Sequence, residues 1–125
     1  MHEKEIEIRW RDLDPYGHVN HAVFLTYLEE VRDEWLIGAV GDDALGYVVA
    51  RVEIDYRREL TQADDCVIAR IRLDSLGTSS VRTVEELAIR HGEVAAEAKA
   101  VLVACDEQRN PRPLTDDERT VLERA

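Results

Sequence analysis

Cysteine is scarce in this chain of 125 residues, which contains only two. That number is too small for the disulfide framework that stabilises small secreted domains. Cys66 and Cys105 both lie in apolar alternating runs, and no metal-ligand spacing surrounds them. We therefore expect two small buried thiols in a reducing compartment. Proline and glycine are scarce as well, at three and six residues, and no repeat, linker or low-complexity segment is visible.

Basic residues are outnumbered, with 16 Lys and Arg against 27 Asp and Glu and a net charge of −11. An acidic chain repels phosphate backbones and anionic membrane surfaces, so we expect neither nucleic acid nor a membrane as a partner. Residues 1–8 alternate charge with isoleucine, which is unlike a signal peptide or a membrane anchor. These absences predict a cytoplasmic protein, and the length predicts a single domain over residues 1–125.

Alternation of apolar and polar residues predicts about five strands. In the first strand, Ile6, Ile8 and Trp10 alternate with charged residues and are expected to face the core. The strands are expected near residues 5–10, 48–56, 67–73, from residue 81 onward, and 94–105. The third and fourth are separated only by the Gly77–Ser80 stretch and should be antiparallel neighbours. Thr115, followed by acidic residues, predicts the N-cap of a short C-terminal helix.

Between the first two strands, the period changes to that of an amphipathic helix over residues 22–36. Its apolar face comprises Phe24, Tyr27, Leu28, Val31 and Trp35. Its flanks carry charged residues, among them Glu29 and Arg32, and Gly38 and Gly41 are expected to end it. One helix covers only one face of such a sheet, so the other face or the edge needs a partner. The pattern predicts an α+β fold, an antiparallel sheet wrapped around a central helix, assembled as at least a dimer.

The run from Asp12 to His21, Asp-Leu-Asp-Pro-Tyr-Gly-His-Val-Asn-His, carries the candidate chemistry. It places a carboxylate, an imidazole and a carboxamide just before the helix, where backbone N–H groups are unpaired and the helix dipole favours negative charge. Attack on a carbonyl needs a base or nucleophile, and preorganised N–H donors for the oxygen that becomes charged. Asp14 and the helix start supply these parts. The alternative for Asp14 is an Asx-turn that stabilises the loop before Gly17.

The same run resembles the opening signature of hot-dog-fold acyl-CoA thioesterases of the 4-hydroxybenzoyl-CoA thioesterase class. The helix residues that carry the resemblance, by their spacing, are Phe24, Tyr27, Glu29 and Arg32. Weaker similarity over residues 54–60 and 76–80 extends it to nearly the whole chain. The resemblance implies a hot-dog fold, a homodimer or homotetramer, and a ligand between two subunits. It also implies hydrolysis of an acyl-CoA thioester to free acid and thiol, with an acyl-carrier-protein thioester as the alternative substrate.

By position, Asp14 resembles the family's catalytic aspartate, which acts as nucleophile or as general base on water. The resemblance also implies that the backbone N–H of His21 polarises the thioester carbonyl. His18 and Asn20 match side chains counted with the catalytic set in the plant acyl-carrier-protein thioesterases. The alternative for His18 is a hydrogen-bonding scaffold, and the alternative for Asn20 is the N-cap of the long helix.

Glu29 is the runner-up catalytic carboxylate, for which an ion pair with Arg32 is the alternative. The resemblance places substrate contacts at Tyr56, Arg58, Thr78, Ser79 and Ser80. It implies no metal, and no cofactor beyond the coenzyme A that forms part of the substrate.

Two other functions stay open. A hot-dog hydratase or dehydratase needs an Asp and a His poised on the acyl chain, and Asp14 and His18 lie close together on one loop. The other is a non-catalytic acyl-CoA-binding protein, because a fold alone does not imply activity. The identity of the acyl group depends on pocket volume, which no sequence feature fixes.

Overall fold

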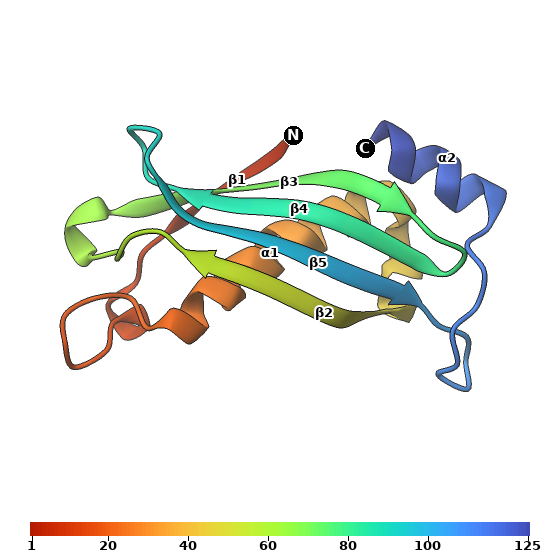
Figure 1. Ribbon diagram of the computed structural model, residues 1–125, viewed down its shortest axis with the longest axis horizontal. Helices are drawn as coiled ribbons and strands as arrows, with labels where there is room; N and C mark the ends of the chain where they lie inside the picture. Colours follow the sequence, from red (N-terminus) through yellow and green to blue (C-terminus); the bar gives the residue numbers. More distant parts are fainter.

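The computed structural model describes residues 1–125 and shows one sheet wrapped over one long helix, with a short helix at the C-terminus (Figure 1). The strands are β1 (His2–Glu7), β2 (Tyr47–Tyr56), β3 (Cys66–Leu76), β4 (Ser80–Ala88) and β5 (Val94–Ala104). The helices are α1 (His21–Val40) and α2 (Asp116–Arg124), and short 3-10 turns lie at Trp10–Asp12, Gly41–Gly46 and Gln62–Asp64. The strand order is β1-β3-β4-β5-β2, and every neighbouring pair is antiparallel. The predicted α+β hot-dog fold is confirmed.

The apolar face predicted for the long helix is the face that α1 packs against the sheet. Its buried apolar residues are Phe24, Tyr27, Leu28, Val31, Trp35 and Leu36. The helix extends past the predicted end because Gly38 is accommodated within it, and it ends at Gly41, whose φ of 65° suits a residue without a side chain. No helix in the structure combines the length and the apolar character needed to cross a membrane.

The prediction that Arg32 lies on a solvated flank of the helix is wrong. Its guanidinium is buried between α1 and β4, where Nε and Nη2 donate to the two carboxylate oxygens of Glu85 at 3.0 and 2.7 Å. Thr83 donates a third hydrogen bond to Glu85 at 2.6 Å. Because a buried charge is tolerated only when it is paired and hydrogen-bonded, each partner accounts for the burial of the other.

Trp10 also departs from the prediction. The strand β1 ends at Glu7, and Trp10 begins a 3-10 turn with its side chain 84% exposed. The cause is local: the Asp12 carboxylate accepts the backbone N–H of Arg9 at 2.9 Å, which turns the chain away from the sheet. Alternation alone cannot reveal such a cap.

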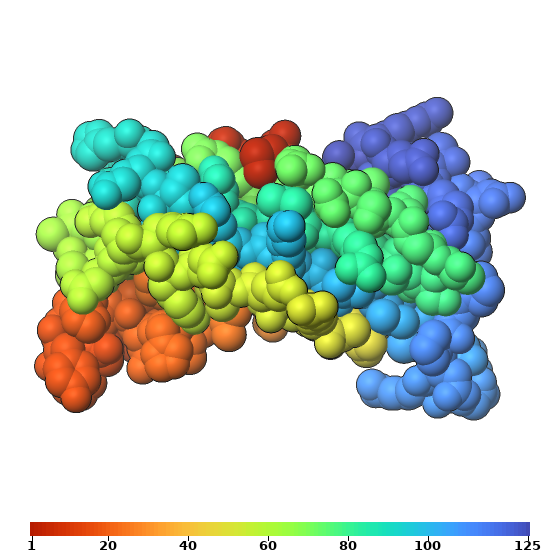
Figure 2. Space-filling model, viewed as in Figure 1, coloured from red at the N-terminus to blue at the C-terminus, as the bar shows by residue number.

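The strand β2 forms one edge of the sheet and pairs only with β5. The register aligns Tyr47 with Ala104 at one end and Tyr56 with Ala96 at the other. The outer edge of β2 has no strand beside it, and Val49, an apolar residue of this strand, is 49% exposed. In the space-filling view, β2 runs along the rim between the lobe that contains the loop before α1 and the lobe around residues 106–110 (Figure 2).

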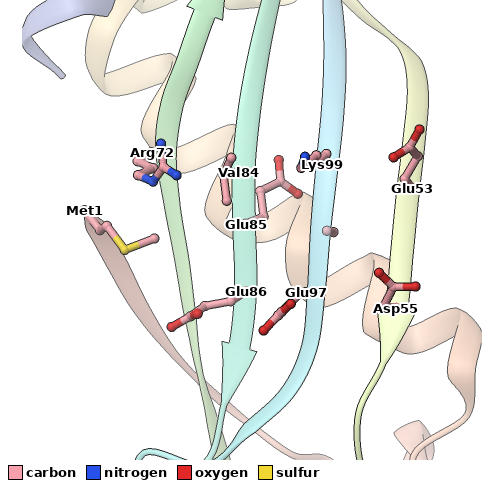
Figure 3. Close-up of a pocket in the computed structure, with 10 residues that line it drawn as sticks. Met1, Glu53, Asp55, Arg72, Val84, Glu85, Glu86, Glu97 and Lys99 are labelled. Carbon is pink, nitrogen blue, oxygen red and sulfur yellow. The ribbon is translucent and has the colours of Figure 1, made fainter.

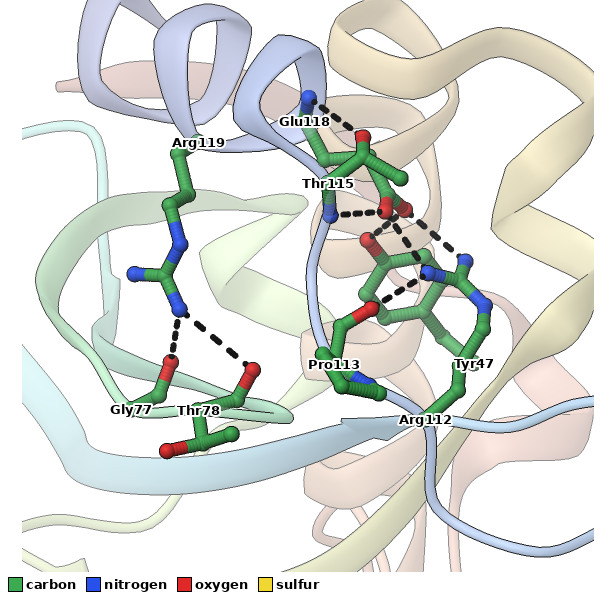
Figure 4. A network of polar contacts seen from close by, with 8 residues as sticks. All are labelled: Tyr47, Gly77, Thr78, Arg112, Pro113, Thr115, Glu118 and Arg119. Carbon is green, nitrogen blue, oxygen red and sulfur yellow. Dashed lines mark hydrogen bonds and ion pairs between the residues drawn. The ribbon is translucent and has the colours of Figure 1, made fainter.

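At the Tyr47 end of β2, a partly buried polar cluster attaches the helix α2 to this strand (Figure 4). Arg112 makes a bidentate ion pair with Glu118 at 2.7 and 2.9 Å. The Tyr47 hydroxyl and the Thr115 N–H donate to the same carboxylate. The hydrogen bonds from Arg112 outweigh the opposing effect of burial and lower the pKa of Glu118 to about 2. Thr115 is the N-cap of α2, as predicted.

We predict that Glu118→Gln destabilises the protein in a pH-dependent way. Because the pKa of Glu118 is depressed on folding from 4.5 to about 2, its stabilisation is present above the unfolded value and is lost as the pH falls through the folded value. The variant should lose about 3 kcal/mol of unfolding free energy at pH 7 and progressively less below pH 4 to 5. Urea unfolding from pH 7 down to pH 2 measures this, with the exposed Glu107→Gln as control. A loss that does not change with pH contradicts the prediction.

Candidate active site

The loop before α1 is a small hairpin over residues 12–20, here called the site hairpin. The Asp14 N–H donates to the carbonyl of His18 at 2.9 Å, and the Asn20 N–H donates to the carbonyl of Asp12 at 3.0 Å. Between these bonds, residues 13 and 19 form a β-bridge. Asp14 therefore stands at the tip of an outgoing strand, and His18 stands opposite it on the returning strand.

The tight turn of the site hairpin holds the Asp14 carboxylate in place. Its Oδ1 accepts the N–H of Tyr16 at 2.9 Å, and the Asp14 carbonyl accepts the N–H of Gly17 at 3.1 Å. Gly17 has a φ of 88°, which a residue with a side chain adopts only with strain. The Asx-turn considered for Asp14 is present, but it occupies only one carboxylate oxygen. The other oxygen, Oδ2, lies 3.6 Å from Nδ1 of His18.

The imidazole of His18 lies between two carboxylates. Its Nδ1 is near Asp14, and its Nε2 lies 3.5 Å from Oε1 of Glu59. A β-bridge between His18 and Thr61 brings the segment after β2 alongside the site hairpin. Glu59 was missed in the sequence because the contact depends on this tertiary bridge, and no local pattern signals it.

The first turn of α1 retains an unpaired N–H group. Asn20 caps the helix: its side chain accepts the N–H of Ala22 at 2.9 Å, and its carbonyl accepts the N–H of Val23 at 2.9 Å. The N–H of His21 has no acceptor within the chain. No acidic residue lies in the first turn, so the positive end of the helix dipole is not neutralised there. An anionic or polarised oxygen would be stabilised at this position.

These groups meet at one cavity of about 350 Å³. It is lined by Asp14, His18, Val19, His21, Phe24, Tyr56, Arg57, Arg58 and Glu59. Tyr56 attaches the end of β2 to the start of α1, because its hydroxyl donates to the His21 carbonyl at 3.0 Å and its ring meets Phe24 edge to face with centroids 5.1 Å apart. The cavity thus joins an apolar wall to a carboxylate, an imidazole and the first residue of α1, whose N–H is unpaired.

Two cations also line the cavity. Arg58 lies 3.3 Å from Asp64 and 3.9 Å from Glu93, and Arg57 lies 3.3 Å from Glu97. Both arginines are therefore partly neutralised by neighbouring carboxylates. Nowhere in the structure do three or more His, Cys, Asp or Glu side chains form a cluster suited to a metal ion.

The remaining predicted site residues do not line this cavity. Asn20 acts as the helix cap. Glu29 is exposed on α1 without a hydrogen bond or ion pair, and the pairing with Arg32 considered for it is wrong because Arg32 binds Glu85. The Thr78, Ser79 and Ser80 turn joins β3 to β4 at the opposite end of the sheet from the site hairpin (Figure 1).

The aromatic residues that line this cavity are Phe24 and Tyr56. Tyr27 and Trp35 are buried in the core, whereas Trp10 and Tyr16 are exposed. These aromatic residues are therefore divided among the cavity, the core and the surface.

A larger cavity, of about 490 Å³, lies on the outer face of the sheet (Figure 3). Its carboxylates include Glu86, paired with Arg70 at 2.8 Å, and Glu97, paired with Arg57. No imidazole and no helix start lie among its lining residues. The smaller cavity at the site hairpin is therefore the better candidate for chemistry on a carbonyl.

The chain is similar to known proteins over most of its length. The model of the thioesterase-like superfamily matches residues 8–122. The long-chain acyl-CoA thioesterase FadM of Escherichia coli is 28% identical over 109 residues, which cover 83% of each chain.

Solved structures are similar over almost the whole chain. A thioesterase from Thermus thermophilus, complexed with coenzyme A and Zn, is 37% identical with a TM-score of 0.89 and covers 98% of this chain and 91% of its own. The probable thioesterase YbaW of Escherichia coli is 27% identical with a TM-score of 0.85, covering 98% and 97%. These relatives do not assign the chain to the 4-hydroxybenzoyl-CoA class. Because the family model spans all but the two ends of the chain, the protein belongs to the thioesterase-like superfamily.

Proposed function

We propose that the protein hydrolyses acyl-CoA thioesters to the free acid and coenzyme A. The observation that carries the proposal is that Asp14 and His21, whose backbone N–H has no partner in the chain, line the same cavity. One group supplies a base or nucleophile, and the other supplies a donor for the carbonyl oxygen. Two relatives support the proposal, since FadM is a long-chain acyl-CoA thioesterase and the Thermus thermophilus thioesterase is complexed with coenzyme A.

In this proposal, the thioester carbonyl oxygen accepts the N–H of His21. Charge develops on that oxygen as the tetrahedral intermediate forms, and the helix dipole stabilises it. Collapse of the intermediate breaks the C–S bond, and the leaving sulfur takes a proton. The binding role of His21 belongs to its backbone, so its side chain serves as part of the cavity wall.

Asp14 acts by one of two routes. As a general base it removes a proton from water, whose oxygen then bonds to the carbonyl carbon. As a nucleophile it bonds to that carbon itself, releases the thiol, and leaves an acyl anhydride that water hydrolyses. His18, between Asp14 and Glu59, is placed to orient the Asp14 carboxylate in both routes.

Tyr56 and Arg58 are the predicted substrate-binding residues that line the cavity, with Arg57 beside them. We assign the apolar wall formed by Phe24 and Tyr56 to the acyl group or the pantetheine arm. We assign the two arginines to the anionic part of the substrate. The acyl identity depends on the full shape of the cavity in the assembled protein.

We further propose that the working unit is a homodimer formed through β2. An unpaired edge strand with exposed apolar residues is ordinarily covered, and a second β2 running antiparallel would extend the sheet. That arrangement places the Tyr47 end of each β2 beside the Tyr56 end of the other. The Thr78–Ser80 turn lies at the Tyr47 end, since Ser80 aligns with Val103 and Val48 aligns with the same residue. In the dimer, the Thr78–Ser80 turn of one copy would then lie at the side of the sheet where the second copy has its cavity.

We predict that Asp14→Asn lowers the rate of thioester hydrolysis by about 10² or more. The substitution removes the base or nucleophile but keeps an oxygen for the N–H of Tyr16, so the fold should remain intact. Thiol release from a panel of short-chain, long-chain and aromatic acyl-CoAs measures the effect. The exposed Asp43→Asn, in the turn after α1, serves as control.

If Asp14→Asn kept the full wild-type activity, the assignment of the reacting carboxylate would shift to Glu59, the other carboxylate that lines the cavity. A wild type that binds coenzyme A but releases no thiol would favour the binding protein. Conversion of an unsaturated acyl-CoA without thiol release would favour the hydratase.

We predict that Asn20 acts through its cap. Asn20→Ala should lower the unfolding free energy by about 1 kcal/mol, because the N–H of Ala22 loses its acceptor. Asn20→Ser keeps a capping oxygen and should keep both the stability and the rate of the wild type. Thermal unfolding and thiol release, measured on both variants, test this. A stable Asn20→Ser variant with a rate reduced about 10²-fold would instead place the carboxamide at the chemistry.

A further inference from the structure

Asp12, the first residue of the site hairpin, is buried but does not line the cavity, and the proposed reaction gives its carboxylate no role. Its Oδ2 accepts the hydroxyl of Tyr27 at 2.6 Å, the N–H of Arg9 at 2.9 Å and Nε of Arg9 at 3.4 Å. Burial opposes ionisation, but the hydrogen bonds from Tyr27 and Arg9 and the Arg9 charge outweigh it and hold the pKa of Asp12 below its ordinary value. A charged carboxylate is therefore kept almost out of contact with water, which is costly unless it is fully bonded.

Tyr27 is the partner of Asp12 on the central helix. Its side chain is fully buried in the second turn of α1. Burial and the bond to Asp12 both raise its pKa, so the phenol remains the donor and the carboxylate remains the acceptor. The contact is short and charge-assisted, which places it among the stronger side-chain hydrogen bonds.

The two strands of the site hairpin are attached to α1 in different ways. The returning strand continues directly into the helix through Asn20, the N-cap. The outgoing strand, which carries Asp14, has no such covalent continuation. It is held at Asp12, whose carbonyl accepts the N–H of Asn20 and whose carboxylate binds Tyr27.

We propose that Asp12 and Tyr27 are positioning residues: their bond joins the outgoing strand of the site hairpin to α1 and fixes the Asp14 carboxylate relative to the His21 N–H. Neither side chain touches the substrate. The inference rests on the proposed function, because the distance it fixes matters only if both groups act on one carbonyl. A displacement of about 1 Å between reacting groups costs up to about 10²-fold in rate.

The chain offers a matched control for this bond. Tyr47 is also a phenol that donates to a buried carboxylate, Glu118, but it does so at the opposite end of the sheet from the site hairpin. The variants Tyr27→Phe and Tyr47→Phe each remove one hydroxyl and keep the ring, so each leaves a carboxylate with one fewer donor. A purely structural role predicts the same result for both.

We expect both variants to melt a few degrees below the wild type and to differ in activity. In Tyr27→Phe, kcat for thiol release should fall about tenfold while KM stays within about twofold, because a displaced Asp14 affects the transition state more than substrate binding. Tyr47→Phe should keep the wild-type kcat at temperatures well below its melting point. Equal kcat values for the two variants would overturn the proposal.

A second measurement does not depend on catalysis. The N–H groups of Asp14 and Asn20 are both bonded within the site hairpin, and their hydrogen exchange reports its opening. Exchange at both should be about tenfold faster in Tyr27→Phe than in Tyr47→Phe. Asp12→Asn, which keeps an acceptor oxygen but loses the charge, should shift exchange and kcat in the same direction.

The two measurements separate the inference from the proposed function. If the wild type releases no thiol from any thioester, the proposed function fails, and the exchange comparison still decides whether Asp12 and Tyr27 hold the hairpin. Exchange that is the same in Tyr27→Phe and Tyr47→Phe overturns the inference even in an active enzyme.

Discussion

The free N–H at the start of α1 is the constraint on which the rest of the site depends. A helix begins with N–H groups that have no partner, and one capping side chain satisfies only some of them. Asn20 takes the N–H of Ala22 and brings no charge, so the His21 N–H and the positive end of the dipole stay available. The segment before α1 must then place a carboxylate close to the His21 N–H without accepting a hydrogen bond from it. A hairpin that turns back on Gly17 meets both demands.

Such a helix start is useful only if the helix itself is held in place. Polar contacts hold α1 at two positions along its length. Near its start, Tyr27 binds Asp12, and further along the helix Arg32 binds Glu85 of β4. Both contacts bury charge, which costs free energy that apolar packing would avoid. A buried bidentate pair accepts few alternative rotations of the helix, whereas apolar surfaces accept many. The polar contacts therefore define how the helix start is oriented towards the site hairpin.

Local periodicity sufficed to predict the helix and most of the strands, whereas the residue types before the helix indicated the segment proposed to carry the chemistry. It failed where a polar side chain finds a partner that the periodic pattern does not show. Arg32 looks like a surface residue until Glu85, far along the chain, lies opposite it. Trp10 follows the alternation of β1 but is turned outward by a cap from Asp12. Glu59 reaches His18 only because a bridge joins two loops. The contacts of Arg32 and Glu59 need the assembled structure, whereas the Asp12 cap is local and interrupts the alternation.

The net charge of −11 raises a physical question for a protein proposed to bind a substrate with several phosphates. At physiological salt the Debye length is about 8 Å, so distant carboxylates are screened and the local charges decide. The local cations, Arg57 and Arg58, already face Glu97 and Asp64. Binding an anion there requires those carboxylates to be displaced or shared, which reduces the gain from the phosphates. Affinity must then come mainly from the acyl and pantetheine portions against Phe24 and Tyr56, and selectivity should follow the shape of that apolar wall.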